Sequence, residues 1–293
     1  MREFEKQTGI HVTLVTDTEA SKSVGLAERL RAEKSNPQAD VWWGNEPFHT
    51  INLAEEGLLD PYESPVTKDI STRYKDPQHR WAGNGLRARV LARSTRVDRP
   101  DSRPPTSSIE LLAHPALKGQ VAMARPTAGT TGGHVAALFV LWGDARAIGF
   151  FKQLRANNIK LLGGNSAVAE AVGNGTALLG LTDNDDVEAA RREGGQLEAV
   201  LPNQDSFGTL MLPTTVGIVR GTRRSEAARK LVDYLLSAPV EKRLIEANFA
   251  EWSVRDDPTK IKVQAMDVDY TAVARAMPAA VRRATAILEG RDE

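Results

Sequence analysis

Short apolar runs alternate with stretches of helical periodicity along almost the whole chain. The apolar runs have the length of buried strands, and the stretches between them place apolar residues every three or four positions. This alternation is typical of an α/β architecture. The chain has 293 residues, which is enough for one large or two mid-sized domains.

The pattern also predicts where the chain passes between two lobes. Two extended segments, residues 86–92 and 214–220, are each suited to cross from one lobe to the other. We therefore expect lobe 1 to hold residues 1–95 with a return segment at about 220–265, and lobe 2 to hold residues 96–219 with the C-terminal helix at about 266–293. The other expected strands are residues 11–15, 39–43, 120–124, 159–162, 177–181, 197–201 and 210–219. The expected helices include residues 130–142, 145–156 and, within the C-terminal segment, about 270–288.

Composition narrows the class of protein. Lys and Arg total 38, Asp and Glu total 38, and the pI is near 7.0, whereas a domain that binds nucleic acid usually has a pI above about 9. We therefore expect no nucleic-acid partner. The absence of Cys excludes disulfides, thiolate metal sites and Cys nucleophiles. The sequence contains no P-loop, no G-x-S-x-G elbow and no H-E-x-x-H pair, so enzyme signatures are scarce.

Small hydroxyl residues and glycine gather at three junctions between a predicted strand and a predicted helix. In open α/β sheets, ligands lie beyond the carboxyl ends of the strands, where helix N-termini offer amide groups to an anion. Each junction alone is explained by ordinary helix capping, but the three together favour an anion site. The residues concerned are Thr18, Gly129, Thr130, Thr131, Asn165 and Ser166.

Acidic and amide side chains follow two other predicted strands. Asn45 and Glu46 follow residues 39–43, and Asp183, Asn184 and Asp185 follow residues 177–181. Oxygen ligands of this kind suit a hard cation or a protonated amine, but acids also simply begin helices. The acids alone therefore do not decide the charge of a ligand.

Two arginines complete the set of candidates. Arg87 and Arg89 are two residues apart, so they share one face of the strand predicted at residues 86–92. A pair of guanidinium groups on one face can clamp an anion, or it can form a solvated face of the sheet.

Seven segments resemble, in the right order, the bacterial family 1 extracellular solute-binding proteins, and most of all their periplasmic ferric-binding branch. They are residues 4–10 (FEKQTGI), 39–41 (ADV), 53–59 (LAEEGLL), 87–91 (RARVL), 126–127 (PT), 165–168 (NSAV) and 227–237 (AARKLVDYLLS). The resemblance implies a two-lobe periplasmic-binding-protein fold of type II, in which each lobe is a mixed sheet flanked by helices. It also implies that the lobes close on a ligand that is handed to an ABC permease.

The resemblance assigns roles to single positions. The family's anion-binding helix start falls on Ala128, Gly129 and Thr130, and its hinge arginine falls on Arg87 or Arg89.

The family's metal ligands are matched less well. Its metal-binding glutamate falls on Asn45 or Glu46, and its pair of iron-binding tyrosines falls on Asn184 and Asp185. Since neither of the latter is Tyr, we expect no phenolate ligation of ferric iron. Glu46 and Asp185 are left as the candidate metal ligands.

The expected function is that of an extracytoplasmic solute-binding receptor of an ABC importer, without catalysis and without a cofactor. It would capture a small polar or anionic solute, or a metal-anion complex, and deliver it to a permease and its ATPase. We expect a monomer in the periplasm or outside the cell that meets the membrane only through the permease. Two alternatives are a phosphate-ester hydrolase or transferase that uses the glycine-rich loop and the Asp group, and a binding module that signals without transport.

The start of the sequence carries one further expectation. The chain opens in a predicted helix around Phe4, with neither a signal sequence nor the strand that the α/β pattern calls for before that helix. We therefore expect an upstream segment that supplies both.

Overall fold

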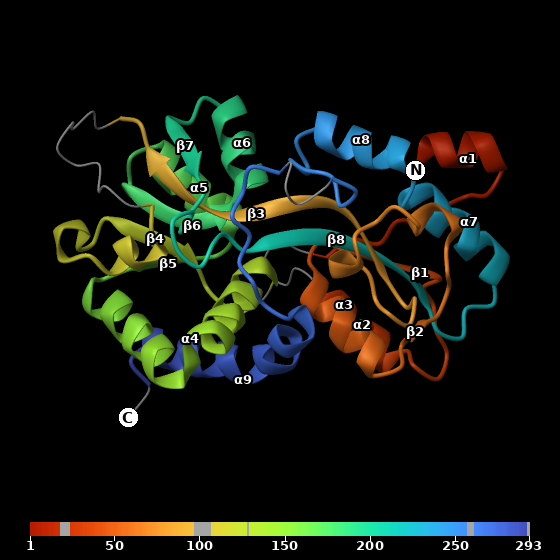
Figure 1. The fold of residues 1–293 in the computed structure, drawn as a ribbon, viewed down its shortest axis with the longest axis horizontal. Coiled ribbons are helices and arrows are strands. Elements are labelled where there is room, and N and C mark those ends of the chain that lie inside the picture. The colour runs from red at the N-terminus through yellow and green to blue at the C-terminus, as the bar shows by residue number, and fades with distance from the viewer. Residues whose placement is uncertain (18–23, 97–106, 128, 257–260, 292–293) are drawn as a thin grey trace. The chain divides into compact units, whose positions relative to one another are not determined.

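The structure is a computed structural model that describes residues 1–17, 24–96, 107–127, 129–256 and 261–291. The chain divides into two compact units, each built from strands and helices (Figure 1). Unit 1 comprises Met1–Leu86 and Pro213–Lys260, and unit 2 comprises Arg87–Leu212 and Ile261–Glu293. Their identity with two ligand-closing lobes stays a prediction.

The sheet of unit 1 is small. Strands β1 (Val41–Gly44) and β2 (Leu59–Asp60) both pair antiparallel with β8 (Met211–Val219). The helices of unit 1 are α1 (Arg2–Thr8), α2 (Val24–Ala32), α3 (Pro47–Glu55), α7 (Ser225–Leu235) and α8 (Ala238–Glu246). Helix α1 is held by Phe4, which is 1% exposed and packs against Tyr234 with ring centroids 5.3 Å apart.

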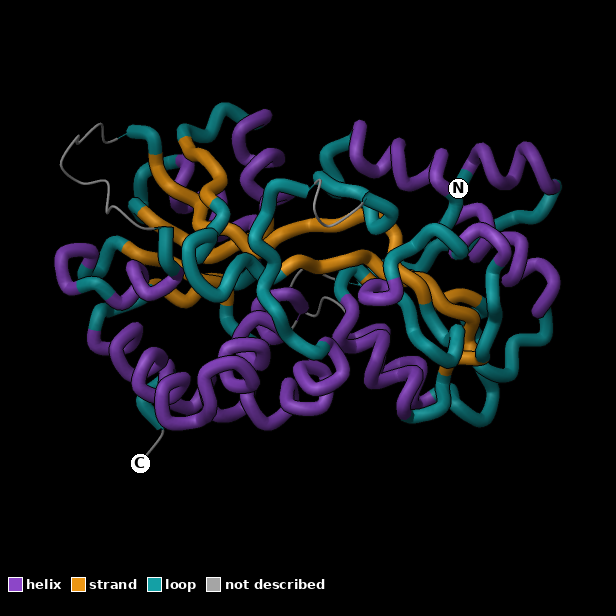
Figure 2. Tube along the Cα trace, viewed as in Figure 1, coloured by secondary structure: helices purple, strands orange, loops and turns teal. Residues whose placement is uncertain are grey.

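The sheet of unit 2 has the order β7-β3-β6-β4-β5, seen as orange tubes in Figure 2. Its strands are β3 (Ala82–Ser94), which begins in unit 1, β4 (Val121–Ala124), β5 (Lys160–Leu162), β6 (Leu179–Asp183) and β7 (Leu197–Val200). Its helices are α4 (Gly129–Ala156), α5 (Asn165–Gly173), α6 (Asn184–Arg192) and α9 (Tyr270–Leu288). Because β4 runs parallel to both β5 and β6, the carboxyl ends of these three strands lie at one edge of the sheet.

Helix α4 is two helices joined end to end. Gly143 interrupts it with φ 73° and ψ 166°, close to the break predicted between residues 142 and 145. Among the described residues, α4 alone is long and apolar enough to cross a membrane by length and composition. Half of its most apolar window is buried, mainly beneath α9, so this is weak evidence for a span.

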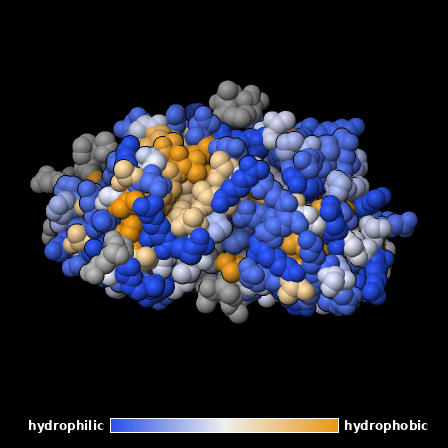
Figure 3. Space-filling view, turned by 90° about the horizontal axis from the view of Figure 1, so that it is seen from below, coloured by the Kyte–Doolittle hydropathy of each residue, from blue (hydrophilic) through white to orange (hydrophobic). Residues whose placement is uncertain are grey.

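The predicted strand at residues 11–15 is wrong, because the described residues there form no strand. Leu14 and Val15 are 60% and 51% exposed, so their alternation with polar residues does not correspond to a buried sheet face. The amide of Val12 donates instead to the carboxylate of Glu5, at 2.8 Å. Figure 3 shows a face on which hydrophilic residues predominate, with apolar residues gathered mainly left of centre in that view.

Two other differences come from glycine and proline. Strand β3 begins at Ala82 rather than residue 86. The prediction missed its first residues because Gly83 and Gly85 are typical of a turn. Residues 60–81, which contain three prolines, begin with the last residue of β2 and include two short 3-10 helices, Pro65–Thr67 and Thr72–Tyr74.

Candidate functional site

Three helices begin at the carboxyl edge of the unit 2 sheet. Helix α4 follows β4, α5 follows β5 and α6 follows β6, each after at most a few residues. Helix N-termini leave backbone amide groups without partners in the helix, and their dipoles favour negative charge. This edge therefore carries positive potential from three helices at once.

The carboxylate of Asp183, at the end of β6, lies at the centre of a buried network on this edge. It accepts a hydrogen bond from Arg89 Nη1 at 2.6 Å and another from Thr130 Oγ1 at 2.7 Å. The amide nitrogen of Asn165 donates to Asp183 at 3.2 Å and to Thr130 at 2.8 Å. One carboxylate thus ties the starts of α4, α5 and α6 together.

Arg89 lies inside this network and donates through both terminal nitrogens. Its side chain is 0% exposed and also donates to Thr130 at 3.1 Å, Asn165 at 3.1 Å and Thr131 at 3.3 Å. Burial alone would raise the pKa of Asp183, but Arg89 and Arg87 outweigh it and hold this pKa below its ordinary value. The Arg89–Asp183 pair is therefore a charged internal brace rather than a surface clamp.

Arg87 lies at the outer side of the network. Its Nη1 donates to Asp185 Oδ2 at 3.0 Å and lies 3.5 Å from Asp183. Its side chain is 4% exposed, whereas that of Asp185 is 18% exposed. Burial and the neighbouring Asp183 raise the pKa of Asp185, and Arg87 only partly opposes them.

Helices α5 and α6 begin without a side-chain cap. Their N-cap residues, Gly164 and Asp183, make no side-chain hydrogen bond to the first turn. The side chain of Asn165 is partly exposed and that of Ser166 is exposed in the first turn of α5. Amide groups and polar side chains at this helix start are the features that bind an oxyanion.

The structure brings most of the predicted site residues together in unit 2. They are Arg87, Arg89, Gly129, Thr130, Thr131, Asn165, Ser166, Asp183, Asn184 and Asp185. Gly129 begins α4 with φ 59°, a left-handed conformation that favours glycine. The side chain of Asn184 has a structural role, because its Oδ1 accepts a hydrogen bond from the amide of Ala88 at 2.8 Å. Of the remaining predicted positions, Thr18 and Ala128 lie outside the described residues.

Asn45 and Glu46 belong to unit 1. Glu46 is 0% exposed and caps α3, accepting from the amide of Phe48 at 2.6 Å and from that of His49 at 3.2 Å. Its carboxylate is thus committed to its own helix, as expected for an acid at an N-cap. The reading of Glu46 as a metal ligand has no support from this geometry.

His134 is a buried neighbour of the network. It is 1% exposed, and neither ring nitrogen has a hydrogen-bond partner among the described residues. Burial and Arg89 lower the pKa of His134 to about 3, so its ring is neutral at physiological pH. Its burial on α4 is that of a packing residue.

Three carboxylates could hold a metal ion. Oxygens of Asp183, Asp185 and Asp186 lie within 4.8 Å of one another. Hard cations prefer such oxygens, but Asp183 and Asp185 are both paired with arginine. A cation would therefore have to compete with two guanidinium groups.

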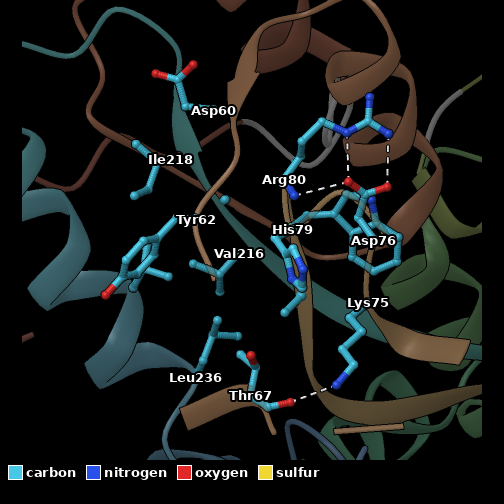
Figure 4. Close-up of a pocket in the computed structure, with 14 residues that line it drawn as sticks. Asp60, Tyr62, Thr67, Lys75, Asp76, His79, Arg80, Val216, Ile218 and Leu236 are labelled. Atoms are coloured by element: carbon cyan, nitrogen blue, oxygen red, sulfur yellow. Dashed lines mark hydrogen bonds and ion pairs between the residues drawn. The ribbon is translucent and has the colours of Figure 1, made fainter. Parts of the chain in front are cut away.

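Unit 1 contains a separate pocket of about 340 Å³, part of it open to solvent (Figure 4). Its polar groups are already paired: Arg80 Nε donates to Asp76 Oδ2 at 2.7 Å, and Lys75 Nζ donates to the carbonyl oxygen of Thr67 at 2.9 Å. The interior admits little more than a water molecule. None of the predicted site residues lines it.

Comparison with solved structures identifies the architecture. The ferric-binding protein from Campylobacter jejuni superposes with a TM-score of 0.84 at 23% identity, covering 98% of this chain and 94% of that one. The periplasmic binding protein AfuA from Actinobacillus pleuropneumoniae, with exogenous fructose-6-phosphate bound, gives a TM-score of 0.82 at 24% identity, covering 98% of this chain and 93% of that one. The fold is that of periplasmic binding proteins, as predicted.

Sequence comparison identifies the family. The bacterial extracellular solute-binding proteins match residues 1–249, and the chain belongs to this family. An uncharacterized protein of Haemophilus influenzae is 30% identical over 221 residues, which are 71% of this chain and 61% of that protein. Iron uptake protein A1 of Synechocystis is 27% identical over 256 residues, 84% of this chain and 69% of that one. A Salmonella typhimurium protein, provisionally named a 2-aminoethylphosphonate-binding periplasmic protein, is 25% identical over 281 residues, 94% of this chain and 77% of that one.

Proposed function

We propose that this chain is the extracytoplasmic receptor of an ABC importer and that it binds the anionic end of a small solute at the carboxyl edge of the unit 2 sheet. One observation carries the proposal, namely the start of three helices around Arg87, Asn165 and Ser166 at that edge. Family membership supports the binding role, and the named ligands of the relatives include iron and a phosphonate.

The anionic end of the solute would lie against the first turn of α5. Asn165 and Ser166 are exposed enough to reach it, whereas Thr130 and Thr131 are buried and act by holding Asn165. Arg87, which is also nearly buried at 4% exposure but pairs with the partly exposed Asp185, would supply the charge. Arg89, at 0% exposure, would position the helix starts without touching the solute.

A hydrolase is the second candidate, and the geometry offers it little. Thr130 donates to Asp183 at 2.7 Å, which is the arrangement of a nucleophile and its base. However, Thr130 is 3% exposed, and Arg89 and Arg87 keep the pKa of Asp183 low, which makes it a weak base. Neither ring nitrogen of His134 has a hydrogen-bond partner that it could activate in the described part of the chain.

Binding and turnover can be tested together. The purified protein should bind phosphonate or carboxylate probes with one site per chain in calorimetry, and the recovered probe should be chemically unchanged. Ser166→Ala should weaken binding by about 10- to 100-fold, the loss of one hydrogen bond to a charged group. The matched control Ser71→Ala, in unit 1, should leave it unchanged. Release of product from p-nitrophenyl phosphate would instead favour the hydrolase.

A further inference from the structure

The ion pair between Arg87 and Asp185 determines what an incoming anion encounters at this edge. Arg89 does not reach a ligand, because it is fully buried and its two terminal nitrogens already donate to Asp183, Thr130 and Thr131. Its remaining donor, Nε, is buried as well, although no described residue accepts from it. Arg87 is therefore the arginine that an anion must engage. In the structure Arg87 already holds a carboxylate, that of Asp185, at 3.0 Å.

Asp185 depends on this one bond. Its Oδ2 accepts from Arg87, and its buried Oδ1 has no hydrogen-bond partner among the described residues. Oxygens of Asp183 and Asp186 lie within 4.8 Å of its carboxylate. An anion that took Arg87 away would leave Asp185 buried beside like charges with neither oxygen paired, which is costly.

Because of the charged side chains around Asp185, this cost depends on the kind of ligand that binds. Arg87 and Arg89 pair with Asp185 and Asp183, and an oxygen of a third carboxylate, Asp186, lies within 4.8 Å of oxygens of both. A simple anion that binds Arg87 therefore adds negative charge beside these carboxylates. A ligand with an ammonium group close to its anionic group replaces both members of the pair, since its anion binds Arg87 and its N–H groups bind Asp185.

We propose that Asp185 makes this site selective for zwitterionic ligands, which carry a cationic N–H group a short spacer away from the anionic group, over simple anions of the same size. This inference rests on the proposed function, because it assumes that the anionic end of the solute binds at Arg87. Asp185 is then a specificity-determining residue that contacts the ligand directly.

The test uses isosteric pairs of probes that differ only in one charged group. The pairs are 2-aminoethylphosphonate with propylphosphonate, and β-alanine with butyrate. In each pair that binds, calorimetry on the full chain should show that the zwitterion binds about tenfold to hundredfold more tightly than its isostere. This ratio corresponds to the free energy of one charge-assisted hydrogen bond. Asp185→Asn should reduce this ratio to within about threefold and should strengthen binding of the simple anion.

Asp186→Asn is the matched control, since it removes the same charge from the same turn of α6 without removing the partner of Arg87. It should retain the selectivity. Equal affinity within a binding pair, or selectivity that survives in Asp185→Asn, would overturn the inference and leave the proposed function standing. Binding of none of the four probes would refute the anion site itself, and the inference with it.

Discussion

Removing the carboxylate of Asp183 should destabilise unit 2 more than any single change on its surface. Asp183→Ala leaves the guanidinium of Arg89 buried at 0% exposure without its carboxylate partner, and it removes the acceptor of Thr130. Breaking a buried ion pair by deleting one partner costs about 3–5 kcal/mol. For a unit of about 160 residues, 1 kcal/mol corresponds to a shift of roughly 2–4 °C in Tm, so the transition of unit 2 should fall by about 6–20 °C.

Differential scanning calorimetry of the full chain measures this shift. The matched control is Glu198→Ala, which removes a carboxylate that is 45% exposed and paired with Arg93, and it should cost less than about 1 kcal/mol. The double variant Arg89→Met with Asp183→Leu should recover much of the loss, because it removes both buried charges. A loss below about 1 kcal/mol in Asp183→Ala would show that the pair is not an internal brace.

Four further outcomes are expected. Asp76→Asn should cost about 1.5–3 kcal/mol in urea unfolding, since it removes the charge that Arg80 binds with two nitrogens at 2.7 and 2.9 Å. Burial would raise the pKa of Asp76, but Arg80 holds it below the ordinary value of 3.8. The stabilisation from this ion pair is therefore fully present above pH 3.8 and is lost as the pH falls through the folded-state pKa of Asp76. This pH dependence should be absent in Asp76→Asn. Glu46→Ala should cost about 0.5–2 kcal/mol as a lost helix cap and leave ligand affinity unchanged. Asp185→Asn should lower the melting temperature less than Asp183→Ala does, because Arg87 also lies 3.5 Å from Asp183 and so keeps a carboxylate neighbour. Ferric iron added to the protein should give no intense visible band, measured by absorption spectroscopy.

Periodicity predicted most of the fold because it depends on which face of each element is buried. Helix α9 occupies the predicted residues 270–288, and strands β4, β5 and β7 differ from prediction by one residue or so at each end. The strand predicted at residues 11–15 failed for a different reason. Alternation describes a strand only where another strand pairs with it, and the described residues provide none there.

The candidate site was predictable as a set of positions but not as a set of partners. Strand ends and helix starts are visible in the sequence, so Thr130, Asn165 and Asp183 could be placed at one edge. Nothing in the spacing of Arg87 and Arg89, which are both buried, says that one pairs with the buried Asp183 and the other with the partly exposed Asp185. That difference comes from β6, whose Asp183 pairs with Arg89 across the sheet at matched register.

The tyrosines show why this edge should recognise its ligand by charge and hydrogen bonds rather than by metal–phenolate chemistry. Each of the four has another place in the structure: Tyr62 donates to Asp233 at 3.0 Å, Tyr234 packs on Phe4, Tyr270 donates to the carbonyl oxygen of Met211 at 2.6 Å, and Tyr74 is buried in unit 1. The groups left at the edge are guanidinium, carboxylate, amide and hydroxyl. The affinity of such groups for a ligand depends on the charges and hydrogen-bond donors that the ligand carries. Changing Asp185 should therefore alter which solute is bound, whereas changing Asp183 should alter whether the site stays folded.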